Sequence, residues 1–304
     1  MIHIFIINPY AGKKNFANDL RSQLDSIEGL NYFVFSTRYA GYETELVKKI
    51  LHIFEGEKLR FYCCGGSGTM RNMLNGFDDL SKAEIAFYPC GLSNDFLKMF
   101  GDQCQRFYNI EELINGDIIK VDYIASNCGV SLNSLSTGLD SNCLEMMDCF
   151  RAARIINDGL PYTLATLYSI FVSKTEKYEV TLDDEVYKGG FAEVFIGNGC
   201  VFGGKMHFAE HTVVNDGEAL FALAGNRKGI SLLPTLMAVT GKKHEKVKKL
   251  MTCGSCSRIR IKRLDGSLFT INQDGDLQKN VNVCEARIVR QGLNLVVPKG
   301  VTVV

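Results

Sequence analysis

The chain has 304 residues, of which 46% are hydrophobic and 22% are charged. These shares are typical of soluble globular proteins and exclude a disordered or collagen-like chain, and the length allows two domains or one large one. Basic and acidic residues number 34 each, and the resulting net charge of zero disfavours a broad nucleic-acid-binding surface, which requires many cations.

The first 120 residues alternate between strand and helix patterns. Apolar alternation predicts strands, and apolar residues at helical spacing predict helices. Strands alternating with helices this closely indicate a parallel sheet with crossover connections. The expected strands are 2–7, 32–36, 60–64 and 85–88, and the expected helices are 15–27, 43–54, 70–75 and 94–99.

After Asp122 the pattern changes, and residues 117–123 are the expected crossover into a second domain. One or two strands are expected in 123–135, followed by a largely helical stretch over 141–173. Short strands then dominate, which is typical of a sandwich or barrel. They are expected at 178–182, 191–196, 219–223, 258–262, 268–271, 281–286 and 293–296, with helices only at 230–240 and 245–250.

The start of the chain does not resemble a signal peptide, because its apolar stretch is short and alternates like a strand. No run approaches the 18 apolar residues of a membrane span. We therefore expect a cytoplasmic protein, at most peripheral to the inner face of the membrane. The eleven cysteines are then expected to be reduced thiols with structural roles.

A glycine-rich loop, Gly65-Gly66-Ser67-Gly68-Thr69, stands between a predicted strand and a predicted helix. Glycines let the backbone approach a phosphate, and a helix N-terminus offers unpaired N–H groups to it. The loop is neither a P-loop nor a dinucleotide-binding fingerprint. Taken alone, it fits a tight turn without a ligand equally well.

Two further loops follow predicted strands of the same sheet. Asn8, Pro9 and Gly12 follow the first strand, and residues 89–96 follow the fourth. In an open parallel sheet, loops at the carboxyl ends of strands are where ligands bind. Three loops at one sheet edge favour a nucleotide site over an empty turn.

In this order, the motifs resemble those of the diacylglycerol kinase catalytic-domain family, which includes bacterial soluble lipid kinases and has sphingosine and ceramide kinases as relatives. The family's opening NP-x-x-G matches 8–12, its GGDGT and NG match 65–69 and 75–76, and its P-x-GT-x-NDF matches 89–96. Its later glycine motifs resemble 136–140, 198–204 and 216–220, and its DGE resembles 274–276.

The resemblance implies a fold of two domains with the ATP site between them. The first, 1–122 with 288–304, is expected to be an α/β domain like those of NAD kinase and phosphofructokinase. The second, 123–287, is expected to be a β-sandwich that receives the lipid, and the final strand returns to the first domain. The implied reaction moves the γ-phosphate of MgATP to a lipid hydroxyl, with diacylglycerol as the default and a long-chain base or undecaprenol-like alcohol left open.

The resemblance also assigns roles to single residues. Asp276 replaces the family's presumed general base, a glutamate, with a carboxylate of similar pKa that is one methylene shorter. Asp95 and Asp274 are the other carboxylates expected to hold magnesium or assist the reaction, although 274–276 also suits a plain hairpin turn. The residues expected to contact the nucleotide are Asn8, Thr37, Gly65, Gly66, Ser67, Gly68, Thr69 and Asn94; Thr37 suits an ordinary loop equally well.

A structural Mg²⁺ site is implied away from the reaction. Its ligands would be the Asp216 side chain and the backbone carbonyls of Val213 and Glu218. A solvated Asp-Gly turn is the alternative. The partners implied are a lipid at a membrane surface and no nucleic acid; the oligomeric state stays open, with a homodimer as one expectation.

Three residues depart from the family pattern where the reaction would occur. Ser67 replaces the aspartate of GGDGT, Leu92 replaces a threonine, and Asp276 replaces a glutamate. Loss of a carboxylate near Mg²⁺ removes a hard anionic ligand. The departures fit a kinase with altered metal geometry, or a pseudokinase that binds nucleotide or lipid.

Two other features carry alternatives. An NAD kinase shares the glycine loop, but the second half of this chain lacks that family's glycine–threonine-rich segment for nicotinamide. The basic run 242–249 suits a solvated helix face or contact with a membrane.

Overall fold

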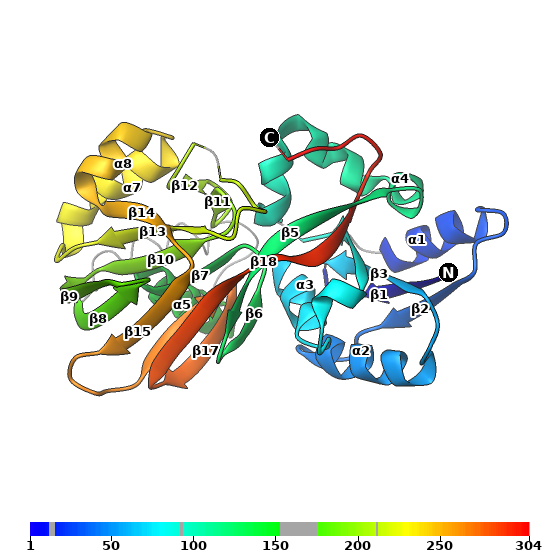
Figure 1. Ribbon diagram of the computed structural model, residues 1–304, viewed down its shortest axis with the longest axis horizontal. Helices are drawn as coiled ribbons and strands as arrows, with labels where there is room; N and C mark the ends of the chain where they lie inside the picture. The colour runs from blue at the N-terminus through cyan, green and yellow to red at the C-terminus, as the bar shows by residue number, and fades with distance from the viewer. Residues whose placement is uncertain (12–15, 92–93, 153–168, 170–174, 211, 304) are drawn as a thin grey trace. The chain divides into compact units, whose positions relative to one another are not determined.

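The computed structural model describes residues 1–304 except 12–15, 92–93, 153–168, 170–174, 211 and 304 (Figure 1). The chain forms two compact units. Unit 1 consists of Met1–Tyr123, Val214–Asp216 and Val289–Val304, and unit 2 of Ile124–Val213 and Gly217–Ile288. The expected boundaries of 1–122 with 288–304 and of 123–287 differ from these by one residue, apart from the short segment Val214–Asp216.

Unit 1 is built on a parallel sheet in the order β2-β1-β3-β4-β18. Strands β3 and β4 are buried along their whole length, as expected for parallel strands with both faces covered. The last part of β18 pairs with β4 in parallel, with Asn294 opposite Glu84. The strands are β1 (Ile2–Ile7), β2 (Tyr32–Ser36), β3 (Leu59–Gly65), β4 (Glu84–Pro89) and β18 (Val283–Val297).

The helices of unit 1 connect these strands. They are α1 (Phe16–Asp25), α2 (Tyr42–Ile53), α3 (Ser67–Leu74), η1 (Leu80–Lys82), η2 (Asp95–Tyr108) and α4 (Ile110–Ile114). Helix α3 begins three residues before the predicted start at Met70, because glycine and serine in its first turn weaken the helical pattern. The predicted helix from Asn94 is the 3₁₀ segment η2, which Gly101 interrupts with a φ of 55°.

Unit 2 contains an antiparallel sheet in the order β14-β13-β10-β7-β16-β17. Its strands are β7 (Ser134–Gly138), β10 (Glu193–Gly197), β13 (Ala219–Ala224), β14 (Thr252–Cys256), β16 (Phe269–Gln273) and β17 (Asp276–Val281). The first part of β18 pairs with β15 (Arg258–Arg263), which pairs with β8 (Glu176–Leu182), and β8 pairs with β9 (Glu185–Phe191).

Two apolar clusters stabilise unit 2. Val194 and Ile196 of β10 lie in one cluster with Ile259 and Ile261 of β15. Phe195, between them on β10, lies in a second cluster with Val239. Alternate residues of one strand thus enter different cores. The second cluster is covered by η3 (Gly229–Leu232), α7 (Leu233–Thr240) and α8 (His244–Leu250).

The remaining elements are β5 (Asp117–Ser126), β6 (Gly129–Ser131), α5 (Leu139–Ala152), β11 (Val201–Phe202) and β12 (Met206–His207). The predicted crossover 117–123 is the first part of strand β5. Of the predicted helical stretch 141–173, the structure describes residues 141–152 and Ser169. No helix in the described ranges is long and apolar enough to cross a membrane.

The predicted fold class is confirmed. The first part of the chain is α/β, the second part is β-rich, and the final strand, β18, pairs with β4 of the first part. Among the described strands, five were not predicted, namely β9, β14 and β17 and the two-residue strands β11 and β12. Strands β9, β14 and β17 each lie at the end of a strand order, so each has one neighbour and carries polar or glycine residues that hide the strand pattern, and β11 and β12 are too short to show one. The predicted strands 281–286 and 293–296 are parts of the single strand β18.

A polar cluster is buried in unit 1 at the start of its strands. Arg60 forms an ion pair with Glu84, with 2.7 Å between Nη2 and Oε2, and its guanidinium also donates to the carbonyl oxygen of Ile114 at 2.9 Å. His3 Nδ1 lies 2.7 Å from the Tyr62 hydroxyl. Burial, followed by the nearby Arg60 charge, lowers the pKa of His3 from 6.5 to about 4.

The lowered pKa of His3 predicts that the folded protein loses stability in acid. Between pH 6.5 and 4 the unfolded chain binds the proton and the folded chain does not, so stability falls as the pH falls through that window. We expect a loss of about 2 kcal/mol in the free energy of unfolding, after allowance for partial exposure of the ring. Chemical unfolding at pH 7 and pH 4.5 measures it. The His3→Gln variant should lose less on acidification, whereas the control His52→Gln, at an exposed position, should behave like the parent; equal losses in all three would contradict the assignment.

Candidate functional site

Three loops of unit 1 meet where their parallel strands end. The carbonyl oxygen of Gly65, the last residue of β3, accepts hydrogen bonds from the backbone N–H groups of Cys90 at 2.8 Å and Gly91 at 3.2 Å. The backbone N–H of Asn8 donates to the Cys64 carbonyl at 3.0 Å. The loops after β1, β3 and β4 are therefore joined through their backbones.

Side chains and a fourth strand end complete this cluster. The Asn8 side-chain amide donates to Thr69 Oγ1 at 3.0 Å. After β2, the backbone N–H of Thr37 donates to the Ile7 carbonyl at 2.8 Å, and Thr37 is buried. The structure thus brings together the residues predicted to contact a nucleotide from this half of the chain, including Asn8, Thr37 and Thr69.

Glycine is required at two of these loop positions. A Cβ on Gly91 would lie 2.6 Å from Gly66 Cα, and a Cβ on Gly65 would lie 2.5 Å from the Thr69 side chain. Both distances are shorter than carbon atoms tolerate. By contrast, a Cβ on Gly68 would meet nothing within 4 Å. The loops are packed closely against each other, and the position of Gly68 faces open space.

Helix α3 begins inside this cluster with Gly66 as its N-cap, and no side chain caps its first turn. The first backbone N–H groups of a helix have no intrahelical partner and carry positive dipole charge, which suits an anion such as phosphate. Ser67 is half-buried at the first helical position. This is the position where the family's aspartate would stand.

Asn94 and Asp95 continue the cluster after β4. Asn94 has a φ of 45°, and its side-chain amide donates to the Gly91 carbonyl at 2.9 Å. Its Oδ1 is buried and has no hydrogen-bond partner in the described part of the chain. The buried carboxylate of Asp95 lies 2.7 Å from Lys98 Nζ, so a lysine already neutralises it. Leu92, the third departure from the family pattern, lies outside the described residues.

The thiols beside these loops are not suited to nucleophilic chemistry. Burial raises the pKa of Cys90 to about 12 and holds the pKa values of Cys63 and Cys64 well above their usual range. All three therefore stay protonated at neutral pH. The cluster presents backbone N–H groups, hydroxyls and amides, a set that binds an anion without covalent chemistry.

Unit 2 holds the predicted carboxylates Asp274 and Asp276, in and after the turn between β16 and β17. Asp274 has a φ of 53° and Gly275 one of 90°, as in an Asn-Gly or Asp-Gly hairpin. The Asp274 carboxylate is buried, and it accepts backbone N–H bonds from 132, 133 and 134 at 2.6–3.0 Å. Its evident task is to hold that loop. Asp276 is half-buried, and its Oδ2 accepts from the Gln278 amide at 3.2 Å.

The predicted structural magnesium ligands lie in the segment before β13. Val213, Asp216 and Glu218 are exposed, and Gly217 has a φ of 87°, which fits the expected Asp-Gly turn. Within the described ranges, no group of three or more His, Cys, Asp and Glu side chains comes together as a metal site. The magnesium role of this turn stays a prediction.

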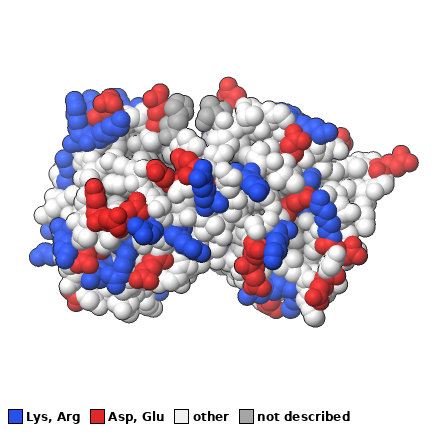
Figure 2. Space-filling model, in the orientation of Figure 1, with Lys and Arg blue, Asp and Glu red and all other residues white. Residues whose placement is uncertain are grey.

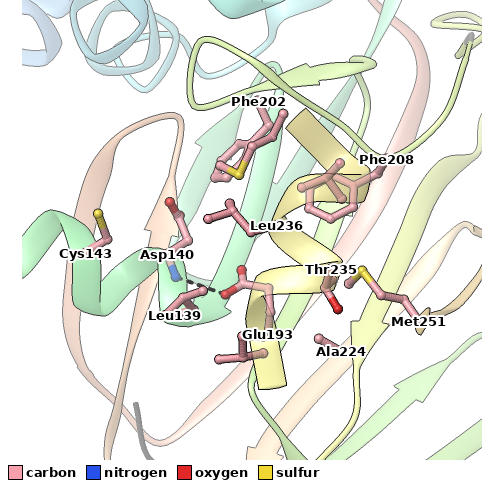
Figure 3. A pocket seen from close by; sticks show the side chains of 13 residues that line it. Leu139, Asp140, Cys143, Glu193, Phe202, Phe208, Ala224, Thr235, Leu236 and Met251 are labelled. Carbon is pink, nitrogen blue, oxygen red and sulfur yellow. Dashed lines mark hydrogen bonds between the residues drawn. The ribbon is translucent and has the colours of Figure 1, made fainter. Parts of the chain in front are cut away.

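An apolar cavity of about 60 Å³ lies in unit 2 between β10 and α7 (Figure 3). Glu193 and Asp140 belong to its otherwise apolar wall, and Thr235 and Leu236 line it from α7. Sequence reasoning missed Glu193. The available signal was a glutamate in the middle of the apolar run Phe191-Ala-Glu-Val-Phe-Ile196, two positions before the buried Phe195.

The Glu193 carboxyl is unusual because it is buried and only half satisfied. Its Oε2 accepts the backbone N–H of Asp140 at 2.9 Å, whereas its Oε1 has no hydrogen-bond partner in the described residues. Burial, and then the Asp140 charge, raises the pKa of Glu193 well above its usual range. Burial thus favours the protonated form of Glu193, which has a hydroxyl to donate. Asp140 itself accepts from the Ser136 hydroxyl and the Asn272 amide.

Comparison with known proteins covers both units. The model of the diacylglycerol kinase catalytic domain matches residues 3–126, and that of the YegS C-terminal NAD kinase beta sandwich-like domain matches residues 133–303. A crystal structure titled as a "putative diacylglycerol kinase" from Bacillus anthracis superposes with a TM-score of 0.71 at 19% identity. It covers 99% of this chain and 96% of that one, and it shows the same fold.

Sequence relatives match over shorter stretches. The "Putative lipid kinase YtlR" of Bacillus subtilis is 36% identical over 98 residues, 32% of each chain. A "Putative lipid kinase" of Staphylococcus aureus is 27% identical over 175 residues, 57% of this chain and 56% of the relative. The matched stretches therefore span from about a third to just over half of the length of these relatives.

The close approach of the loops predicts that Gly91→Ala is damaging. The added methyl group would overlap Gly66, so the two loops must separate, and we expect a loss of about 1–3 kcal/mol in stability. Binding of a nucleoside triphosphate should also weaken. Thermal unfolding and calorimetric titration measure the two effects. The matched control is Gly225→Ala, where a Cβ would meet nothing within 4 Å; identical behaviour of both variants would refute the packing argument.

Proposed function

This chain belongs to the diacylglycerol kinase catalytic-domain family, and on that premise we propose that it is an ATP-dependent lipid kinase. It transfers the γ-phosphate of MgATP to the hydroxyl of a diacylglycerol-like lipid. The observation that carries the proposal is the junction of three glycine-containing loops around the start of α3, held together by the carbonyl oxygens of Cys64 and Gly65.

The nucleotide phosphates are proposed to bind at the start of α3. The uncapped N–H groups there, from Ser67 to Thr69, supply donors to phosphate oxygens. The open space at Gly68 leaves room for those oxygens. Magnesium enters with the nucleotide in this proposal, since Mg²⁺ in kinase sites keeps several waters and binds through few carboxylates plus substrate phosphates.

Asp276 is the proposed general base that accepts the proton of the lipid hydroxyl. The Asp274 carboxylate is less suited to that role because three backbone N–H groups already engage it. A carboxylate at the position of the family's glutamate has the right chemistry, provided that it comes within about 3 Å of the hydroxyl oxygen.

We propose that the cavity beside Glu193 accepts the apolar part of the lipid. Its lining is suited to hydrocarbon, and the carboxyl of Glu193, whose protonated form burial favours, can donate to an ester or hydroxyl oxygen. The cavity volume of about 60 Å³ is equal to that of about two water molecules. Entry of an acyl chain therefore requires the α7 wall to move outward.

A pseudokinase that binds nucleotide or lipid is the second candidate, and a specific observation favours it. Ser67 supplies no carboxylate at the start of α3, and the one carboxylate predicted nearby, Asp95, is paired with Lys98. Phosphoryl transfer depends on charge neutralisation and positioning, so this arrangement would slow turnover while leaving binding intact.

A phosphorylation assay separates the two candidates. With labelled ATP, magnesium and a panel of lipids in detergent, the unaltered chain should form lipid phosphate.

Asp276→Asn should lower the rate about 100-fold if it removes a general base. Ser67→Asp should raise the rate about tenfold, since it restores a ligand for the metal; Ser22→Asp, at an exposed position on α1, is the control. Product from Ser67→Asp alone would establish the pseudokinase, and no product from either would reject the kinase.

Glu193 gives a separate prediction about the lipid. Glu193→Leu removes a buried carboxyl with one unpartnered oxygen but also leaves the backbone N–H of Asp140 without its acceptor, so the two effects oppose each other and the free energy of unfolding should change by less than about 1 kcal/mol. The same change should raise KM for the lipid about tenfold, because the donor to the lipid oxygen is lost. Glu193→Gln keeps a donor and should raise KM less. Thermal unfolding and steady-state kinetics decide; a lipid KM unchanged in both variants would exclude contact with the lipid.

A further inference from the structure

The segment formed by η3 and α7 contains no charged residue from Gly229 to Gly241. On its inner side, Leu232, Thr235, Leu236 and Val239 line the cavity. Their spacing places them on one helical face. Contact with the cavity explains why the inner face of the segment is apolar.

The outer side of the same segment is also apolar, although it faces solvent. The side chains of Ile230 and Met237 are each 67% exposed, and Pro234 between them is exposed as well. Residues 230, 234 and 237 follow helical spacing, so they form a second stripe opposite the first. Ser231 and Thr240 are exposed beside this stripe, but no charge interrupts it, and an uncharged helix with large apolar side chains on both faces is normally enclosed by protein or by lipid.

Basic residues flank this apolar stripe on both sides. Arg227 and Lys228 precede it, and the segment after it supplies Lys242, Lys243, Lys246, Lys248 and Lys249. Glu245 is the one acidic residue between 226 and 251. Figure 2 shows the blue side chains gathered over α8. In a chain with equal numbers of acidic and basic residues, seven basic residues against one acidic residue mark a strongly positive surface.

These lysines are available for an external partner. The five lysines from Lys242 to Lys249 are exposed. Among the described residues, the ion pair within this group joins Lys248 to Glu245 at 3.6 Å, and both side chains are exposed. A second copy of the chain would bring the same positive surface against this one and be repelled. The charge pattern therefore favours an anionic partner with an apolar interior.

We propose that η3, α7 and α8 dock on a bilayer that contains anionic lipids. Ile230 and Met237 enter the acyl region, and the lysines contact the headgroups, as in interfacial helices that combine an apolar face with basic residues. Because α7 also forms a wall of the cavity, its outward movement would open the cavity toward the bilayer. That delivery role rests on the proposed function; the docking itself does not.

Vesicle co-sedimentation of the full chain without ATP tests the docking. We expect binding to vesicles of phosphatidylcholine mixed with phosphatidylglycerol and at least tenfold weaker binding to phosphatidylcholine alone, since each lysine near an anionic surface contributes about fivefold. Raising the salt concentration should weaken binding through screening. Binding that ignores both phosphatidylglycerol and salt would overturn the proposal.

Two sets of variants locate the surface. The triple variant Lys246→Glu, Lys248→Glu, Lys249→Glu should lose at least about tenfold in vesicle affinity. Its matched control, Lys48→Glu, Lys279→Glu, Lys299→Glu, carries the same charge change at exposed positions elsewhere. The pair Ile230→Ser, Met237→Ser should lose about tenfold or more, and Val186→Ser, Leu264→Ser is its control at exposed apolar positions. Equal affinity of variants and controls would overturn the assignment.

Two further readouts separate competing outcomes. If Ile230→Ser, Met237→Ser instead converts a dimer to a monomer in sedimentation while vesicle binding stays unchanged, the stripe contacts a second copy and the proposal fails. Kinase activity on detergent-solubilised lipid should stay unchanged in these variants, whereas activity on vesicles falls. Vesicle binding without kinase activity would reject the proposed function and leave the docking intact.

Discussion

The contact between the backbones at Gly65, Gly66 and Gly91 is the constraint on which unit 1 depends. One carbonyl oxygen, that of Gly65, accepts two N–H groups from the loop after β4, and the approach is so close that a single methyl group on Gly91 would not fit. This contact fixes the loops relative to the start of α3. Without it, the backbone N–H groups in the first turn of α3 would have no fixed position relative to the neighbouring loops.

Much of this arrangement could be predicted from the sequence. The periodicities of 2–7 and 32–36 give strand bounds that agree with the structure, and glycine-rich turns after parallel strands place the loops at one edge of the sheet. The edge strands β9, β14 and β17 could not be found this way, because one-sided pairing leaves room for polar residues. Nor could the pairing of Asp95 with Lys98 be read from residue types alone.

The acidic residues show why roles cannot be assigned from residue type. Asp274 and Asp276 stand two positions apart, yet the first holds a loop through three backbone N–H groups and the second does not. Glu193 is a third case, since its burial on an apolar face raises its pKa and so favours the protonated, hydrogen-donating form over the charged one. The roles of Asp274 and Glu193 depend on long-range neighbours between 132 and 140, which no local pattern reveals.

Strand β18 has a consequence for biosynthesis. Its final residues complete the sheet of unit 1 beside β4, and they follow all of unit 2 along the chain. A ribosome therefore produces β1 to β4 early but supplies their last neighbour only after the antiparallel sheet has been made. Until then the edge of β4 lacks its partner strand. Both units thus wait for the same strand, since the first part of β18 pairs with β15 of unit 2 and its last part with β4 of unit 1.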